Sequence, residues 1–215
     1  NNVSVRIVGL SGVGKTRLVQ ALFDNRIGDE NTVLDPENVL YTDLSDTPTP
    51  QPNAMAEALI SADADCVLVV DNCGPDAHQK LTEIVMRSGS KLRLVTIEYD
   101  IRDDLPEDTV CYRLEGSSEN VIKQLLKRKY PKLSDPDIDK ITEFSDGNAR
   151  VALALASSSE TKGELARLGD AELFKRLFLQ KNSENDDLLK VAEVASLLYS
   201  FDFEGTTDNS ELTTL

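Results

Sequence analysis

The stretch that decides the fold is SVRIVGLSGVGKT, which runs from Ser4 to Thr16. Its first five residues, Ser4 to Val8, alternate in polarity as the residues of a β-strand do. Glycines follow at once, and the stretch from Thr16 to Phe23 places its apolar residues at helical spacing. The sequence therefore predicts a strand, a glycine-rich loop and a helix in direct succession.

The loop from Gly9 to Thr16 matches the pattern GxxxxGK(S/T) at every fixed position. Its glycines let backbone N–H groups curl around a phosphate, and the start of the helix adds further unpaired N–H groups. Lys15 can reach the β- and γ-phosphates of a nucleotide, and Thr16 offers a hydroxyl to Mg²⁺. The alternative is a glycine turn before an ordinary helix, with Lys15 merely solvated. The predicted nucleotide-binding residues are Gly9, Ser11, Gly12, Val13, Gly14, Lys15, Thr16 and Arg17.

A second acidic group for the metal follows an apolar run. Residues 66–70 read as a buried parallel strand that ends in Asp71, and ligands of open α/β sheets bind at that edge. Asp71 is therefore predicted to hold Mg²⁺, directly or through water; the alternative is that it caps the following turn. Many ATPases with such a loop place an acid at the next position to activate water, but here it is Asn72. Because Asn accepts no proton, hydrolysis is predicted to be slow unless Asp76 or Glu98 substitutes.

Two more residues are candidates for contact with the nucleotide. Thr96 closes the apolar strand at residues 92–97 and could touch the γ-phosphate or the attacking water; the alternative is β-propensity alone. Arg150 lies in the first turn of a helix predicted at residues 149–157, where the helix dipole disfavours a cation. It is therefore predicted to face an anion such as the terminal phosphate, the alternative being a solvated surface arginine. The predicted catalytic residues are Lys15, Asp71, Thr96 and Arg150, and the predicted metal ligands are Thr16 and Asp71.

The order of elements predicts an α/β fold followed by helices. Strands at residues 4–8, 39–44, 66–70, 92–97 and 109–114 alternate with helices, which favours a parallel sheet with right-handed crossovers. After Gly116 the pattern is helical only. We expect a nucleotide-binding domain at residues 1–115, a helical domain at 116–180 and a further helical unit that starts in 181–215. Both ends read like the boundaries of a piece of a longer protein.

The composition narrows the classes of function. A net charge of −15 disfavours attraction to bulk nucleic acid or to anionic lipid. Cys66, Cys73 and Cys111 are widely spaced and His78 is the one histidine, which disfavours a zinc site or a disulfide framework and favours a reducing, cytoplasmic compartment. No apolar run is long enough to predict a membrane span. The basic cluster at residues 123–132 is predicted to be a solvated helix face; docking of an acidic partner or nucleic acid is the alternative.

The segments GLSGVGKTRL, VLVVDN, LRLVT and FSDGNARVALALA together resemble the STAND class of signalling ATPases, the NACHT and NB-ARC relatives that are close to AAA+ proteins. The resemblance covers about residues 3–200. It implies a P-loop core, a helical lid and a winged-helix domain that begins in residues 181–215. It also implies that Asp71 is the magnesium carboxylate and Thr96 the first sensor. NB-ARC lids carry Gly-x-Pro where this chain has Gly147-Asn148-Ala149-Arg150, which looks more like the second sensor of AAA+ clamp loaders and replication initiators.

The same resemblance implies a function, an ATP/ADP switch with slow hydrolysis. In that class ADP holds a closed monomer, a ligand sensed by a C-terminal region permits ATP exchange and self-association, and an N-terminal effector then acts. Microbial members often serve in antiphage defence. The alternative is an AAA+-like DNA-associated ATPase of the replication-initiator or clamp-loader type. A small-molecule kinase is disfavoured because no lid is inserted within the predicted sheet domain.

Overall fold

The computed structural model describes residues 3–27, 34–99, 106, 108–162, 165–178 and 186–195. The chain divides into two compact units. The first comprises Asn1–Ile122 together with Ser145–Arg150, and the second comprises Lys123–Phe144 and Val151–Leu215. The predicted domain boundaries near residues 115 and 180 remain predictions.

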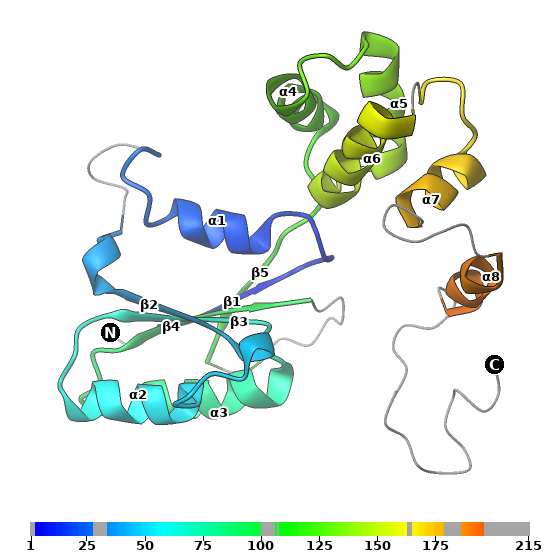
Figure 1. Cartoon of the computed structure of the whole chain (residues 1–215). Coiled ribbons are helices and arrows are strands. Elements are labelled where there is room, and N and C mark those ends of the chain that lie inside the picture. The colour runs from blue at the N-terminus through cyan, green and yellow to red at the C-terminus, as the bar shows by residue number, and fades with distance from the viewer. Residues whose placement is uncertain are drawn as a thin grey trace, which may run out of the picture. The chain divides into compact units, whose positions relative to one another are not determined.

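The first unit is built on a five-stranded parallel sheet in the order β2-β3-β4-β1-β5. Parallel neighbours need crossover connections, and helices provide several of them. This arrangement confirms the predicted α/β class (Figure 1). The strands are β1 (Ser4–Val8), β2 (Val39–Asp43), β3 (Val67–Asp71), β4 (Arg93–Glu98) and β5 (Val110–Arg113).

Helices cover both faces of this sheet. Helix α1 (Lys15–Ala21) lies on one face, and α2 (Pro52–Ser61) and α3 (Pro75–Val85) lie on the other, as Figure 1 shows. Short 3₁₀ turns, η1 (Pro36–Asn38) and η2 (Leu44–Asp46), flank β2.

The two apolar clusters identify the face to which each strand residue points. Val67 and Val69 of β3 pack with Val19 of α1, whereas Leu68 and Val70 pack with α3. Side chains alternate along a strand, so the last residue of β3 falls on the α1 face. This alternation decides which polar side chains at the strand ends meet the glycine-rich loop.

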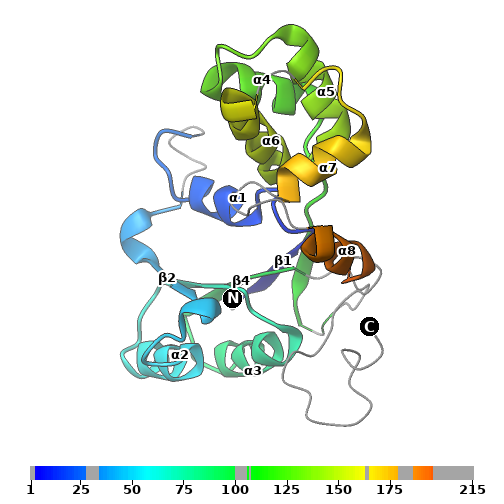
Figure 2. The same cartoon turned by 45° about the vertical axis from the view of Figure 1, so that its right-hand side comes forward.

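The second unit is helical in its described residues, and α4 to α7 gather together in both views (Figures 1 and 2). Its elements are α4 (Glu119–Lys129), α5 (Asp135–Ser145), α6 (Ala149–Lys162), α7 (Asp170–Phe178) and α8 (Asp186–Ala195), of which α4 and α6 start, and α5 ends, in the first unit. Of the region predicted to begin a winged helix, α8 is the described part. The winged helix therefore remains a prediction, and most of it falls outside the described residues.

The basic cluster of the sequence lies against acidic residues of the same unit. Lys123 Nζ is 2.7 Å from Asp139 Oδ1, and Lys127 Nζ is 3.1 Å from Asp135 Oδ1. All four side chains are at least one-third exposed. These pairs neutralise part of the cluster and agree with a solvated helix face. Among the described residues, no helix combines the length and the apolar character needed to cross a bilayer.

Candidate nucleotide-binding site

The loop after β1 adopts a backbone that only glycine tolerates easily. Gly9, Gly12 and Gly14 have φ values of +146°, +89° and +111°. A Cβ atom on Gly9 would lie 2.2 Å from the carbonyl oxygen of Leu114, so a side chain there would force the chain apart. Val13 is buried and anchors the loop to the core. The loop thus has the open, amide-rich curvature that the GxxxxGK(S/T) pattern predicts.

Lys15 is folded into this loop and is not a solvated surface lysine. Its Nζ donates hydrogen bonds to the carbonyl oxygens of Gly9 at 2.8 Å and Leu10 at 3.0 Å. Burial lowers the pKa of Lys15, and the Arg150 charge adds to this effect, whereas the carboxylates of Asp71 and Glu98 oppose it. The ammonium group therefore lies among the backbone groups that would surround a phosphate.

Asp71 brings three elements together at the C-terminal end of β3. Its Oδ2 accepts hydrogen bonds from the Thr16 hydroxyl at 2.7 Å and from the Tyr41 hydroxyl at 2.9 Å. Its Oδ1 accepts the N–H of Asn72 at 2.9 Å. Asp71 therefore caps the turn that follows β3 and also faces Thr16. Capping the turn and holding Mg²⁺, the two roles considered from the sequence, are compatible. Burial, with the hydrogen bond to Asp71, raises the pKa of Tyr41 well above its usual range, so the phenol keeps its proton.

Asp43 lies beside Asp71 and was not identified from the sequence. The two residues are partners in the β2–β3 register. Asn72 has a φ of +51° and donates from Nδ2 to Asp43 Oδ1 at 2.8 Å. Although burial raises the pKa of Asp43, hydrogen bonds from Asn72 and Ser45 outweigh it and hold the pKa below its ordinary value. The available sequence signal was an aspartate near the end of the predicted strand at 39–44, which matches the position of Asp71.

The segment Ser145–Arg150 belongs to the first unit and contacts the loop directly. Arg150 Nη1 donates to Ser11 Oγ at 3.0 Å, and its backbone N–H donates to the Gly12 carbonyl at 3.3 Å. Asn148 Nδ2 donates to the Ser11 carbonyl at 2.8 Å. A Cβ on Gly12 would lie 2.5 Å from Asn148 Oδ1. The structure therefore brings Arg150 to the glycine-rich loop, together with Asn148, which sequence reasoning did not single out.

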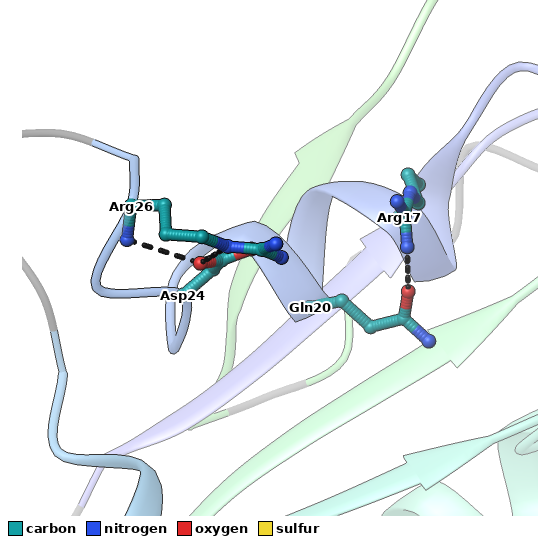
Figure 3. A network of polar contacts seen from close by, with 4 residues as sticks. All are labelled: Arg17, Gln20, Asp24 and Arg26. Atoms are coloured by element: carbon teal, nitrogen blue, oxygen red, sulfur yellow. Dashed lines mark hydrogen bonds and ion pairs between the residues drawn. The ribbon is translucent and has the colours of Figure 1, made fainter.

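The Arg17 side chain points along its own helix (Figure 3). Its Nη1 donates to Gln20 Oε1 at 2.9 Å on the exposed side of α1. One turn further, Asp24 and Arg26 form an exposed pair at 2.7 Å. Any contribution of Arg17 to a bound nucleotide would therefore come from its backbone N–H.

Thr96 is not brought to the loop. Its side chain is fully buried on the α3 face, where its hydroxyl shares a 2.8 Å hydrogen bond with His78 Nδ1. His78 Nε2 lies 3.0 Å from the hydroxyl of Thr109. Burial, assisted by the charge of Arg6, lowers the pKa of His78 to about 4. This neutral, hydrogen-bonded histidine is part of the core, and Thr96 belongs with it.

Asp76, a possible substitute base, lies in the first turn of α3.

The oxygen atoms of Thr16 and Asp71 fit Mg²⁺ by their chemistry. Magnesium takes hard oxygen ligands and is usually bound by one or two protein groups together with phosphates and water. Across the ranges that the structure describes, no group of three or more His, Cys, Asp or Glu side chains could hold a metal ion. A metal at Thr16 and Asp71 would therefore depend on oxygens supplied by a bound nucleotide.

Comparison with known proteins supports this interpretation at the level of the fold. The sequence matches no protein-family model and no curated protein. Its structure is similar to a STAND protein with a tetratricopeptide repeat sensor from Pyrococcus horikoshii, with a TM-score of 0.50 and 16% identity over 95% of this chain and 34% of that one. The chain thus spans about a third of the length of that protein.

Two AAA+ structures are similar as well. The AAA domain of FIGL-1 in complex with ADP has a TM-score of 0.51 and 10% identity, and covers 90% of this chain and 77% of that one. A chain of a HORMA:CdnC:Trip13 complex of E. coli MS115-1 has a TM-score of 0.50 and 10% identity. That match covers 86% of this chain and 75% of the other. The parallel sheet, the glycine-rich loop and these structural similarities all indicate the same fold. The chain has the P-loop NTPase fold that STAND and AAA+ ATPases share.

Proposed function

We propose that this chain binds ATP and ADP at the loop Gly9–Thr16, with Lys15 on the β- and γ-phosphates. One observation carries the proposal. Thr16 and Asp71 are 55 residues apart in sequence, yet their side chains meet at 2.7 Å beside a loop with three positive-φ glycines. Such a group of backbone amides, a lysine and a hydroxyl–carboxylate pair matches the requirements of a nucleoside triphosphate with its metal.

Each side chain has a role in this proposal. Thr16 and Asp71 would hold Mg²⁺, which neutralises charge on the phosphates when it is bound. Arg150 would supply a second cation to the γ-phosphate, because it already reaches the loop at Ser11. Asn72 accepts no proton, so hydrolysis would be slow.

We further infer that the nucleotide acts as a switch in a larger protein. The support is the STAND structure, which is about three times as long as the matched part and carries a separate sensor. On this basis the ADP form would be a closed monomer and the ATP form would self-associate. An N-terminal effector and a C-terminal sensor would lie beyond this chain, in a cytoplasmic signalling protein of the NACHT or NB-ARC kind, with antiviral defence as one such role.

A second candidate is an AAA+-like ATPase that acts on DNA. The observation in its favour is the contact of Asn148 and Arg150 with Ser11, which fits a second sensor better than a Gly-x-Pro lid. The net charge of −15 counts against it. A labelled duplex whose mobility shifts in a salt-dependent way with this chain would favour this second function.

The main proposal is tested by titrating the chain with ATP and with ADP in the presence of Mg²⁺, followed by sedimentation velocity. We expect both nucleotides to bind and only ATP to increase the sedimentation coefficient. A chain that binds neither nucleotide would overturn the proposal. A chain that binds both without any change of mass would remove the switch but leave nucleotide binding in place.

A further inference from the structure

We propose that Asp43 is the carboxylate that orients and deprotonates the water attacking the γ-phosphate, and that Asn72 is its positioning residue. This inference rests on the proposed binding of ATP at the P-loop. The residue after Asp71, where many such ATPases carry the acid that activates water, is here the amide Asn72. The inference assigns that role to a carboxylate on the neighbouring strand β2.

The β2–β3 pairing places Asp43 on the correct side of the sheet. Asp43 and Asp71 are register partners in two parallel strands, so their Cα atoms are neighbours across the ladder. Val39 of β2 and Val69 of β3 both pack in the α1 cluster. By alternation along each strand, both carboxylates therefore point to the face that carries the P-loop and α1.

Asn72 fixes the position of the Asp43 carboxylate. Its left-handed φ of +51° turns the chain directly after β3. From this turn, its Nδ2 donates to Asp43 Oδ1 at 2.8 Å, across the end of the sheet. An acid in place of Asn72 would put a second negative charge against Asp43, whereas the amide is attracted to it. The Asp71–Asn72 sequence is therefore suited to holding a carboxylate on the adjacent strand.

One oxygen of Asp43 is left for a water molecule. Oδ1 accepts from Asn72 Nδ2, from the Ser45 N–H at 2.9 Å and from the Ser45 hydroxyl at 2.7 Å. Within the part of the chain that the structure describes, Oδ2 accepts no hydrogen bond from protein. The residue is partly exposed, so water reaches it. A carboxylate fixed through one oxygen and open at the other is the arrangement required of a general base.

Hydrolysis at this site transfers the γ-phosphoryl group of ATP to water. The oxygen of water forms a bond to the γ-phosphorus while the bond from that phosphorus to the β–γ bridging oxygen breaks. The water proton passes to Asp43 Oδ2 and then to solvent, and the electron pair of the broken bond leaves with ADP. The products are ADP and inorganic phosphate.

Glu98 and Asp76 are weaker candidates for the same role. The Glu98 carboxylate is close enough to raise the pKa of Lys15, but Glu98 has the same parity along β4 as Thr96, which lies on the α3 face. Asp76 starts α3, on the face opposite to α1. Asp43 differs from both because it shares its face and its strand register with Asp71.

The test uses single-turnover hydrolysis of ATP, with nucleotide affinity measured in parallel. Asp43→Asn keeps an oxygen that accepts the existing hydrogen bonds but removes the base. We expect turnover to fall about a hundredfold or more, with ATP and ADP affinities within about twofold of the wild type. After incubation with ATP and denaturation, the variant should release mainly ATP where the wild type releases ADP. Asp46→Asn, an exposed carboxylate three positions away, is the matched control and should behave as the wild type.

A double-variant comparison tests the positioning role of Asn72. Asn72→Ala should lower turnover about tenfold, and Asp43→Asn combined with Asn72→Ala should be no slower than Asp43→Asn alone. The inference would be overturned if Asp43→Asn kept wild-type turnover, or if turnover were lost in Glu98→Gln instead. It would also be overturned if the wild-type chain bound ATP without hydrolysing it. Those outcomes leave ATP binding intact, whereas failure of the wild type to bind ATP would overturn the proposed function as well.

Discussion

Thr16 and Asp71 meet through a 2.7 Å hydrogen bond, although one residue lies in the first turn of α1 and the other is the last residue of β3. The hydroxyl and the carboxylate are thereby held against each other before any ligand binds. Protein groups fixed in this way need little rearrangement to take up a metal–nucleotide complex. The first prediction follows from this pair.

Asp71→Asn is expected to remove most of the magnesium dependence of ATP binding. The substitution takes away the charge opposite the metal, and a loss of about tenfold to a hundredfold in metal affinity is expected. Calorimetric titrations with and without Mg²⁺ measure the difference, and the affinity without metal should change little. Asp24→Asn, which changes a partly exposed acid paired with Arg26 beyond the C-terminal end of α1, serves as the control. Unchanged magnesium dependence in Asp71→Asn would show that another residue holds the metal.

Lys15→Ala is expected to weaken both ATP and ADP by about tenfold to a hundredfold. The ammonium bonds to the loop carbonyls of Gly9 and Leu10, so the melting temperature without nucleotide should change by only a few degrees. Lys91→Ala, which removes an exposed lysine paired with Asp63, is the matched control. Equal ATP affinity in Lys15→Ala and the wild type would contradict the phosphate-binding role of the loop.

The unmodified chain is expected to hydrolyse ATP well below about 10 s⁻¹, the median of enzymes. Asn72 accepts no proton, His78 is buried on the α3 face away from the loop, and Asp43 has a lowered pKa that makes it a weak base. A steady-state assay of released phosphate checks this. Turnover at or above that median would mean that a stronger base lies near the γ-phosphate.

Arg150→Ala is expected to reduce the preference for ATP over ADP by about tenfold to a hundredfold, with ADP affinity nearly unchanged. The reason is that a cation beside Ser11 would gain most from the terminal phosphate. Competition titrations of the two nucleotides measure the ratio, and Arg17→Ala, which removes an exposed cation of α1 bonded to Gln20, is the control. Equal losses for ATP and ADP would assign Arg150 to the α- or β-phosphate instead.

The pH dependence of stability should report on His78. Its pKa is about 4 in the folded chain and about 6.5 when unfolded, so the unfolded state binds the proton more readily. The contribution of His78 is therefore fully present above pH 6.5 and declines as the pH falls towards 4, by up to about 1.4 kcal/mol per pH unit. Urea unfolding at pH 7, 6 and 5 measures it. His78→Gln should be less stable at pH 7 and show a flatter slope; an equal slope would contradict the buried, neutral state.

The amino-acid sequence by itself determined most of the helices and strands and the glycine-rich loop. Glycines at three fixed positions, a following Lys-Thr pair and the apolar run before Asp71 are local signals, because φ preference and hydrophobic period act over a few residues. The same local signals predicted the parallel sheet, since strands and helices alternate along the first half of the chain. The sequence therefore sufficed to predict Lys15, Thr16 and Asp71 as candidate site residues.

Only the tertiary structure decided which side chains meet. The sheet order places β2 beside β3, and that pairing alone makes Asp43 a neighbour of Asp71. Thr96 was predicted at the correct sheet edge, but its face was decided by packing against α3, where it bonds to His78. Period-two alternation says that neighbouring side chains point to opposite faces; it does not say which face carries the loop. Strand pairing and face selection depend on contacts between residues far apart in the chain, and such contacts form only when the whole core is assembled.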